Sequence, residues 1–390
     1  MRAGLTLLCL AYVLSQFFRA FLAVLSGVLA QDIGTTPDDL SFASGLWFLS
    51  FAAMQIPVGW ALDRIGPRRT AWVLLLIGGA GGAAVFAMAT SALHINIAML
   101  LIGIGCSPVL MASYYIFARQ FPAAQFATLA ALMVGVGSVG NLVAAYPMAW
   151  AAETLGWRLS LWTLAAVSGL VALGIALTVR DPEPVNGETR GSLLDLLKMP
   201  VLWTILPLAI VSYTPAGAVR GLWIGPYLQD VFGLTTGQVG QATLIMGVAM
   251  ICGTLCYGPL DRLFKTQKWV VFVGNVFCAA AVLALAFFVG VNPWLSIALC
   301  AALGFFGGSY PVIMAHGRGF FPPHLAGRGV TLLNLCSIGG VGVMQFISGP
   351  LHNAASAHGV EAGYAAVFGF IGVSLLLGMA IYLFSRDSTN

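Results

Sequence analysis

The sequence predicts an all-α membrane protein, with twelve transmembrane helices arranged as two pseudo-symmetric bundles of six. Three observations lead to this prediction. Hydrophobic residues make up 59% of the 390 residues and charged residues only 8%, whereas roughly 25% are charged in an ordinary soluble domain. Mean hydropathy is +0.94. Apolar segments of membrane-spanning length recur along the chain, and the second half of the chain repeats features of the first.

The apolar segments are separated by charged or turn-rich breaks. A helix needs about 20 mostly apolar residues to cross about 30 Å of hydrocarbon. Twelve segments meet this requirement, starting near residues 4, 41, 69, 95, 126, 158, 200, 236, 268, 293, 328 and 362. The first is interpreted as a retained helix and not a cleaved signal peptide, because its apolar run exceeds the roughly 7 to 15 residues of a signal core and contains Arg19.

The distribution of positive charge supports the same topology, because cytoplasmic loops are enriched in Lys and Arg. With the N-terminus in the cytoplasm, fourteen of the seventeen Lys and Arg residues fall on the cytoplasmic side and only Arg158 falls outside. Arg19 and Arg220 lie inside predicted spans. The net charge of +4 therefore reflects topology and does not indicate nucleic-acid binding. We expect a functional monomer in a bacterial-type cytoplasmic membrane, with both termini in the cytoplasm.

A polar segment divides the spans into six and six. The expected organisation is a bundle at 1–180, a cytoplasmic linker at 181–198 and a second bundle at 199–390. The Asp-Arg pair at 63–64 recurs 198 positions later at 261–262, and the same offset relates Gln-Asp at 31–32 and 229–230. A unit duplicated in the same orientation predicts two bundles related by an axis along the membrane normal.

A glycine-rich and charged loop follows the second span. Its pattern G-x-x-x-D-R-x-G-x-R-R comprises Gly59, Asp63, Arg64, Gly66, Arg68 and Arg69. With the duplication, a glycine-rich fifth span and the degenerate copy at Asp261 and Arg262, it resembles the loop signature of the major facilitator superfamily over essentially the full chain. That family is one of membrane transporters.

The charges of this loop have two interpretations. In the first, Gly59 lets two helices approach closely, while Asp63 lies near a helix N-terminus or pairs with Arg68 or Arg69. Such a cluster, with Arg64, Asp261 and Arg262, would hold the cytoplasmic ends of the halves together in one state and break in the other. In the second, the charges only set topology. We favour gating for Asp63, which topology does not require.

Two arginines inside spans are the strongest functional signal. An arginine at the bilayer centre costs about 2.5 to 3.5 kcal/mol, so it persists only beside a cavity, a partner or a substrate. Arg19 lies thirteen residues before Asp32 and Arg220 lies ten before Asp230, about 20 and 15 Å from their helix ends. Both are therefore placed deep in the membrane.

Matching side chains surround the two arginines. Tyr12 and Tyr213 each precede an arginine by seven residues, which is about two helical turns and places each pair on one face. Ser15 and Gln16 extend the first stripe, and Pro215 and Gly217 are expected to bend the second helix. The resemblance implies that spans one, four, seven and ten line the central cavity, which would receive both arginines.

The charge balance points to an anionic substrate. All thirteen acidic residues lie in predicted loops or near span ends. We expect the negative charge near Arg19 and Arg220 to arrive with a small anion, held by charge-assisted and bidentate hydrogen bonds. The arginine pair also resembles that of organic-anion and organophosphate carriers in the superfamily. The alternative is that each arginine caps backbone carbonyls or stacks on Phe17, Phe18 or Trp223.

Other polar groups at suitable depth are candidate substrate contacts or packing residues. Asn141 in the fifth span and Tyr310 in the tenth are retained as contacts, while Met111, Met314 and Gln345 are more typical of packing. Span four lacks the arginine of many proton-driven family members, and His316 is the only histidine with a suitable position for proton coupling. The sequence therefore favours anion exchange or facilitated diffusion.

Three other function classes were weighed. A copper importer is suggested by Met246 and Met250, because thioethers select Cu(I), but two cavity arginines would repel a cation. A non-transporting sensor is disfavoured because no additional domain is expected. An enzyme is not expected, since no nucleophile, base and orienting acid converge in any segment, and no cofactor is predicted.

Overall fold

The computed structural model describes residues 2–121, 123–182, 196–322 and 326–387. It divides the chain into two compact units, Met1–Gly187 with Thr236–Gly240 and Glu188–Thr235 with Gln241–Asn390. The described residues are almost entirely helical, which confirms the predicted fold class. The predicted linker 181–198 lies mostly outside the described residues, and the predicted domain limits remain predictions.

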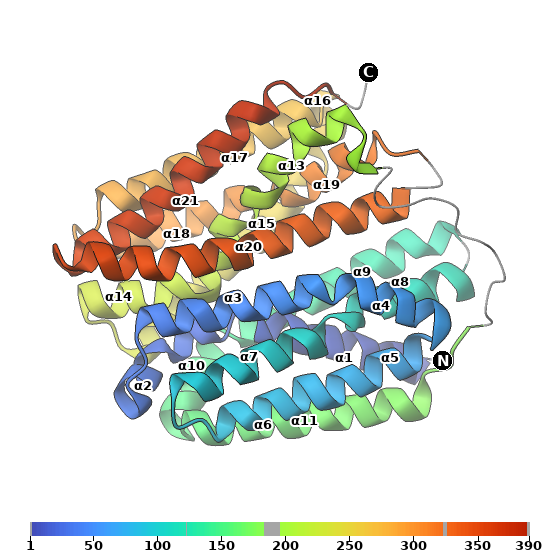
Figure 1. Ribbon diagram of the computed structural model, residues 1–390, viewed down its shortest axis with the longest axis horizontal. Coiled ribbons are helices and arrows are strands. Elements are labelled where there is room, and N and C mark those ends of the chain that lie inside the picture. The colour runs from blue at the N-terminus through green and yellow to red at the C-terminus, as the bar shows by residue number, and fades with distance from the viewer. Residues whose placement is uncertain (1, 122, 183–195, 323–325, 388–390) are drawn as a thin grey trace. The chain divides into compact units, whose positions relative to one another are not determined.

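Helices of the first unit make up its six spans, several of them broken into shorter segments (Figure 1). They are α1 (Arg2–Phe18), α2 (Leu22–Ile33), α3 (Pro37–Ala53), α4 (Gln55–Arg64), α5 (Pro67–Leu74), the π-helix η1 (Leu75–Ala80), α6 (Gly81–Ala87), α7 (Ala92–Cys106), α8 (Pro108–Gln120), α9 (Ala123–Val143), α10 (Tyr146–Thr154) and α11 (Trp157–Thr178).

The second unit has the same kind of construction. Its helices are α13 (Pro200–Ser212), the π-helix η2 (Pro215–Trp223), α14 (Ile224–Phe232), α15 (Thr236–Tyr257), α16 (Leu260–Phe264), α17 (Lys268–Phe287), α18 (Pro293–Gly307), α19 (Tyr310–Arg318), α20 (Ala326–Ser356) and α21 (Val360–Tyr382). Each of the twelve predicted span starts lies within four residues of a helix start.

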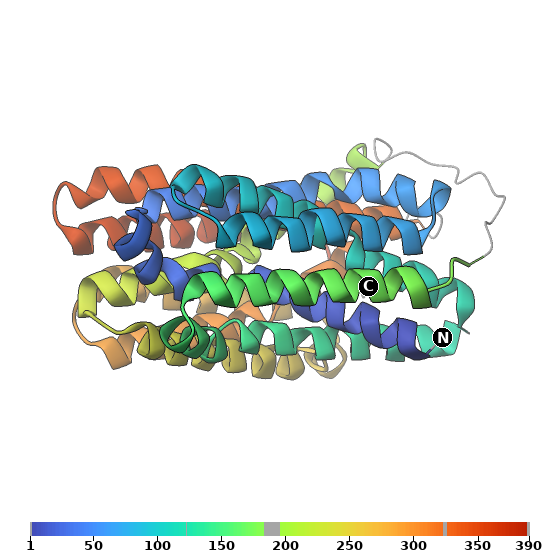
Figure 2. The same cartoon turned by 90° about the horizontal axis from the view of Figure 1, so that it is seen from below.

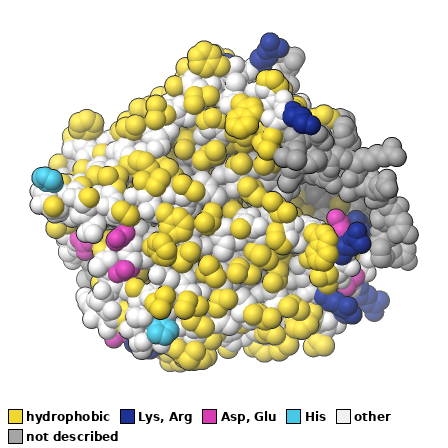
Figure 3. Space-filling model, viewed as in Figure 1, with side chains coloured by type: hydrophobic (Ala, Val, Ile, Leu, Met, Phe, Trp, Pro, Cys, Tyr) yellow, Lys and Arg dark blue, Asp and Glu magenta, His cyan; other side chains and the backbone are white. Residues whose placement is uncertain are grey.

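Eleven helices of the described residues are long and apolar enough to cross a membrane, and a bent pair forms a twelfth span. The bent pair is α1 and α2, whose axes differ by 53°. The expectation of one continuous first helix is therefore wrong. Hydrophobic side chains cover most of the face shown in Figure 3, and large apolar residues such as Trp60 and Trp203 are 62% and 57% exposed. Such surfaces suit contact with lipid.

Helix ends follow the local sequence. Glycines in the left-handed conformation end the corresponding helices α2 and α14, Gly34 with φ +69° and Gly233 with φ +65°. Glycine adopts this conformation at little steric cost. Thr36 and Asp39 form a capping box at the start of α3, in which the Asp39 N–H donates to Thr36 Oγ1 and the Thr36 N–H to the Asp39 carboxylate. The matching glycine ends of α2 and α14 show that the repeat detected in the sequence is present in the structure.

Packing within each unit places the candidate site residues on interior helices. In the first unit, α1 lies beside both α9 and α11, and α11 is the long green helix that crosses the middle of Figure 2. In the second unit, α13 lies beside α20 and α21 (Figure 1). The spans that carry Arg19 and Arg220 therefore pack against other helices of their own unit.

Candidate functional site

Arg19 lies at the bend of the first span. Arg19, Ala20 and Phe21 separate α1 from α2, and the N–H groups of Ala20 and Phe21 both donate to the Phe17 carbonyl at 3.0 and 3.2 Å. The break contains neither proline nor glycine. Aromatic packing holds it instead: the Phe17 and Phe21 rings stack with centroids 5.8 Å apart, and Phe21 contacts Phe86 at 5.3 Å.

The Arg19 guanidinium lies over two rings of α3. Its central carbon is 5.3 Å from the Trp47 ring centroid and 5.5 Å from that of Phe51. These rings are themselves stacked, with centroids 5.2 Å apart and planes at 17°. Aromatic stacking, the alternative interpretation of Arg19, is thus present, but with Trp47 and Phe51 in place of Phe17 or Phe18. Stacking uses the face of a guanidinium, whereas its hydrogen-bond donors project from the edge.

The predicted stripe on α1 forms a hydrogen-bonded pair. Gln16 Nε2 donates to the Tyr12 hydroxyl at 3.1 Å, and both side chains are buried. Glycines of α9 allow this arrangement, because a Cβ built on Gly137 would lie 2.2 Å from the Tyr12 ring. Asn141, a predicted contact, follows on the same helix and is also buried. The structure therefore brings α9 against the Tyr12 and Gln16 segment of α1.

Arg220 lies within the π-helix η2, all nine residues of which are buried. Its own exposed fraction is 3%. Pro215 begins this segment, and the Gly217 N–H donates to the Tyr213 carbonyl at 2.7 Å. Because π-helical bonding runs from i to i+5, the seven-residue spacing of Tyr213 and Arg220 no longer equals two α-helical turns. The second arginine therefore occupies a backbone of a type often found at functional sites.

Tyr213 and Tyr310 are neighbours in the second unit. Their ring centroids are 4.8 Å apart, and the Tyr310 hydroxyl donates to Asn334 Oδ1 at 3.2 Å. Both tyrosines are predicted contacts, whereas the sequence does not predict a role for Asn334.

Trp223, the last residue of η2, joins that segment to α20. Its indole N–H donates to Gln345 Oε1 at 2.9 Å and to Ser348 Oγ at 3.1 Å. All three side chains are buried. A buried indole N–H that finds two acceptors fixes the end of η2, since an unsatisfied donor in an apolar interior is costly.

The charged loop of the first unit forms two ion pairs that differ from those expected. Arg119 of α8 approaches the Asp63 carboxylate at 3.9 Å, and Arg68 approaches Asp181 at the same distance. The Arg68 backbone N–H also donates to Asp181 at 2.7 Å. The expected pairing of Asp63 with Arg68 or Arg69 is therefore wrong. Each arginine instead bridges segments far apart in sequence.

The remaining loop residues lie at helix ends. Arg64 ends α4 and is exposed, as is Arg69. In the second unit, Asp261 and Arg262 lie in the short helix α16, where Gln267 Nε2 donates to Asp261 at 3.3 Å. In the second unit, a side-chain amide donates to Asp261, whereas in the first unit Arg119 forms an ion pair with Asp63.

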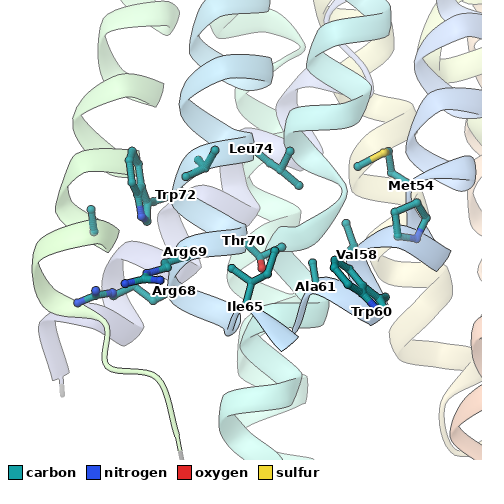
Figure 4. A pocket seen from close by; sticks show the side chains of 13 residues that line it. Met54, Val58, Trp60, Ala61, Ile65, Arg68, Arg69, Thr70, Trp72 and Leu74 are labelled. Atoms are coloured by element: carbon teal, nitrogen blue, oxygen red, sulfur yellow. The ribbon is translucent and has the colours of Figure 1, made fainter. Parts of the chain in front are cut away.

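A groove of about 590 Å³ borders the same loop. Figure 4 shows Arg68 and Arg69 on one side of it and Trp60 on the other. Its lining also includes Val58 and Trp72 and is almost wholly apolar. Neither Arg19 nor Arg220 lines this groove.

His316 is held in place by both ring nitrogens. Nδ1 lies 2.7 Å from the Tyr382 hydroxyl and Nε2 lies 2.9 Å from the Arg386 carbonyl. These contacts tie α19 to the end of α21. They fit a structural role for this histidine.

The methionine pair offers no support for a metal site. Met246 is fully buried, and a Cβ built on Gly304 would lie 3.2 Å from its Cγ, so this side chain packs against α18. Met250 lies one turn further along α15 and is partly exposed. Among the described residues, no group of three or more His, Cys, Asp or Glu side chains is placed to hold a metal.

Among the described residues, eleven apolar helices of spanning length, or twelve with the bent pair counted as one span, in two repeated units define a polytopic membrane protein. The Major Facilitator Superfamily model matches residues 8–342 and 221–390. The chain belongs to the Major Facilitator Superfamily, as its loop signature indicated.

The curated relatives are distant. The chain is 23% identical over 361 residues to the sialic acid transporter NanX of Escherichia coli, covering 87% of this chain and 85% of the relative. It is 23% identical over 280 residues to the probable sulfoacetate transporter SauU of Cupriavidus necator, covering 67% and 65%. That match spans just under two thirds of SauU.

Solved structures share the fold. A D-xylose-proton symporter matches with a TM-score of 0.78 and 16% identity, covering 99% of this chain and 98% of that one. A bacterial homologue of the human lysosomal transporter Spinster, inward-facing and occupied, matches with a TM-score of 0.76 and 18% identity, covering 98% and 96%. At these identities the likeness concerns the fold alone.

Proposed function

We propose that this transporter moves a small organic anion across a bacterial-type cytoplasmic membrane by alternating access. Arg19 and Arg220 bind the anionic group, and Tyr12, Gln16, Asn141, Tyr213 and Tyr310 contribute further contacts. The observation that carries the proposal is that each unit holds an arginine where its first span departs from α-helical geometry, at the α1–α2 break and within η2.

The chemistry of the two arginine environments supports anion binding. A guanidinium is costly in a membrane interior, and Arg220 is 97% shielded, since only 3% of it is exposed. Arg19 rests on Trp47 and Phe51, which leaves the donor-bearing edge of the fork to face other groups. Carboxylates, sulfonates and phosphates can accept two parallel hydrogen bonds from the N–H groups on that edge.

The relatives point in the same direction. Their names refer to sulfoacetate, sialic acid, galactarate or glucarate, and 4-hydroxybenzoate. Each of these compounds carries a carboxylate or sulfonate at neutral pH. A shared anionic group on otherwise different molecules suits a site whose fixed element is a pair of guanidinium groups.

The charged loop serves as a gate in this proposal. The pairs Asp63–Arg119 and Arg68–Asp181 hold the span ends of the first unit together. Arg64 and Arg69 of the same unit, and Asp261 and Arg262 of the second unit, are further proposed gating residues. The concentration of Lys and Arg near these ends supports a cytoplasmic location for them and for both termini. The transporter functions as a monomer.

Uptake by proteoliposomes tests the proposal. Vesicles preloaded with unlabelled sulfoacetate, sialic acid, glucarate or 4-hydroxybenzoate are given the labelled form of the same compound. At least one should exchange saturably. Arg19→Lys and Arg220→Lys should lower this exchange about 10- to 100-fold, since a charged hydrogen bond contributes about 1.5 to 3 kcal/mol and 1.4 kcal/mol is tenfold.

Matched controls separate a specific effect at the proposed site from a general effect of replacing arginine by lysine. Arg180→Lys and Arg318→Lys make the same change at exposed arginines near span ends, and both should exchange as wild type does. Wild-type exchange rates in both Arg19→Lys and Arg220→Lys would refute the anion site.

A further inference from the structure

The side chain of Gln16 has one polar atom without a hydrogen-bond partner. Gln16 is only 8% exposed. Its amide Nε2 donates to the Tyr12 hydroxyl at 3.1 Å, and the carbonyl oxygen Oε1 forms the other end of the amide. This oxygen is buried, and no group of the described residues forms a hydrogen bond with it. The amide of Gln16 is therefore held at one end and open at the other.

A buried glutamine of the second unit, Gln345 of α20, has both ends of its amide bonded. Its Oε1 accepts from the Trp223 indole N–H at 2.9 Å, and its Nε2 donates to the Ala218 carbonyl at 3.5 Å. Buried polar groups are usually bonded in this way, because a buried acceptor that has lost its bonds to water and found no other partner is costly. The open carbonyl of Gln16 is therefore suited to receive its hydrogen bond from a bound molecule.

Arg19 lies one helical turn further along the same span. It follows Gln16 by three residues, which places both side chains on one face, about 4.5 Å apart along the helix axis. The Cys106 thiol at the end of α7 interacts with the Ser15 hydroxyl and with the Arg19 charge. The guanidinium therefore lies near the turn of α1 that carries Ser15 and Gln16. A charged donor and an open acceptor are thus available about one turn apart.

We propose that the substrate is a 2-hydroxycarboxylate, an anion whose hydroxyl group lies on the carbon next to the carboxylate. The carboxylate accepts hydrogen bonds from the Arg19 guanidinium, and the hydroxyl donates to Gln16 Oε1. The proposal rests on the anion transport proposed above and names the class of anion. The two groups of such a substrate are adjacent, as are the side chains of Gln16 and Arg19 on one face of the span.

The charge of Arg19 decides which kind of donor can meet the Gln16 carbonyl. An ammonium group also donates hydrogen bonds, but in an amino acid it would lie beside the guanidinium. Like charges repel more strongly in an interior of low dielectric constant than in water. A hydroxyl donates without carrying a charge. The site should therefore distinguish a 2-hydroxy acid from the amino acid and from the unsubstituted acid of the same size.

Three acids of nearly equal size test the proposal. L-lactate, L-alanine and propionate carry a hydroxyl, an ammonium group or a hydrogen on the carbon next to the carboxylate. Each competes with labelled sialic acid or glucarate, which carry such a hydroxyl, during exchange by proteoliposomes. Lactate should inhibit at a concentration about 5- to 150-fold lower than propionate, which leaves the Gln16 carbonyl unpaired, and alanine should inhibit least. Equal inhibition by lactate and propionate would overturn the proposal.

Variants assign the preference to Gln16. Gln16→Met removes the carbonyl but keeps the length of the side chain, and should bring the inhibitory concentrations of propionate and lactate close together. Gln31→Met, the same change at an exposed position near the end of the span, should keep the wild-type ratio. A wild-type ratio in Gln16→Met would overturn the proposal.

Two further results keep the test decisive even if Gln16→Met folds poorly. In thermal unfolding of purified wild type, lactate should raise the midpoint more than propionate does at the same concentration, and equal midpoints would overturn the proposal. Exchange of only sulfoacetate or 4-hydroxybenzoate, which lack a hydroxyl next to the anionic group, would also overturn it. Absence of exchange of all four compounds in wild type would instead refute the proposed function.

Discussion

Gly140 of α9 lies so close to α1 that a Cβ built on it would be 1.9 Å from the carbonyl oxygen of Val13. This approach positions the segment that carries Tyr12 and Gln16. In membranes, small residues at helix interfaces permit such close backbone packing. The glycine-rich fifth span is therefore part of the architecture that places the proposed substrate contacts.

Gly140→Ala should separate α9 from α1 and destabilise the protein. Overpacking of this kind costs about 1 to 3 kcal/mol. Gly135→Ala provides the matched control on the same helix, because nothing lies within 4 Å of a Cβ built there. Thermal unfolding in detergent should show a lower midpoint for Gly140→Ala only. Equal midpoints for the two variants would contradict the close contact.

Trp47→Phe should weaken anion transport without abolishing it. The smaller ring offers a weaker cation–π contact to Arg19, a difference of about 0.5 to 1 kcal/mol, or about two- to fivefold in apparent affinity. Trp60→Phe, at an exposed position in the groove of Figure 4, is the control. The KM for the transported anion should rise in Trp47→Phe alone. An unchanged KM would show that the rings do not orient Arg19 for binding.

Asp63→Asn should slow transport while leaving stability nearly unchanged. The Asp63 carboxylate is largely exposed, and exposed ion pairs contribute about 0 to 1 kcal/mol. If the pair acts as a gate, the exchanged variant Asp63→Arg with Arg119→Asp should recover part of the rate. A normal rate in Asp63→Asn would contradict the gating role of this carboxylate.

Much of the fold follows from the sequence because span length and charge placement are local properties. Helix starts at Pro200, Thr236, Lys268 and Pro293 coincide with the predicted ones. The break at Arg19 could not be predicted, because no proline or glycine marks it and aromatic packing against Phe86 accompanies it. Tertiary contacts of this kind have no local signature.

The contacts of the proposed site could not be predicted from the sequence. Hydropathy identifies Arg19 and Arg220 as charges within apolar runs. It does not reveal that Trp47 lies beneath Arg19 or that Arg119 reaches Asp63, since these partners come from other spans.

Direct binding to the purified protein tests the central claim most directly. Sulfoacetate, sialic acid, glucarate and 4-hydroxybenzoate are each added to wild type, Arg19→Lys and Arg220→Lys in thermal unfolding. A ligand at 100 times its Kd stabilises the folded state by about 2.7 kcal/mol. At least one compound should raise the midpoint of wild type, and should raise it clearly less in both variants, whose binding is expected to be about 10- to 100-fold weaker. Equal stabilisation of all three proteins would contradict an anion site built on these arginines.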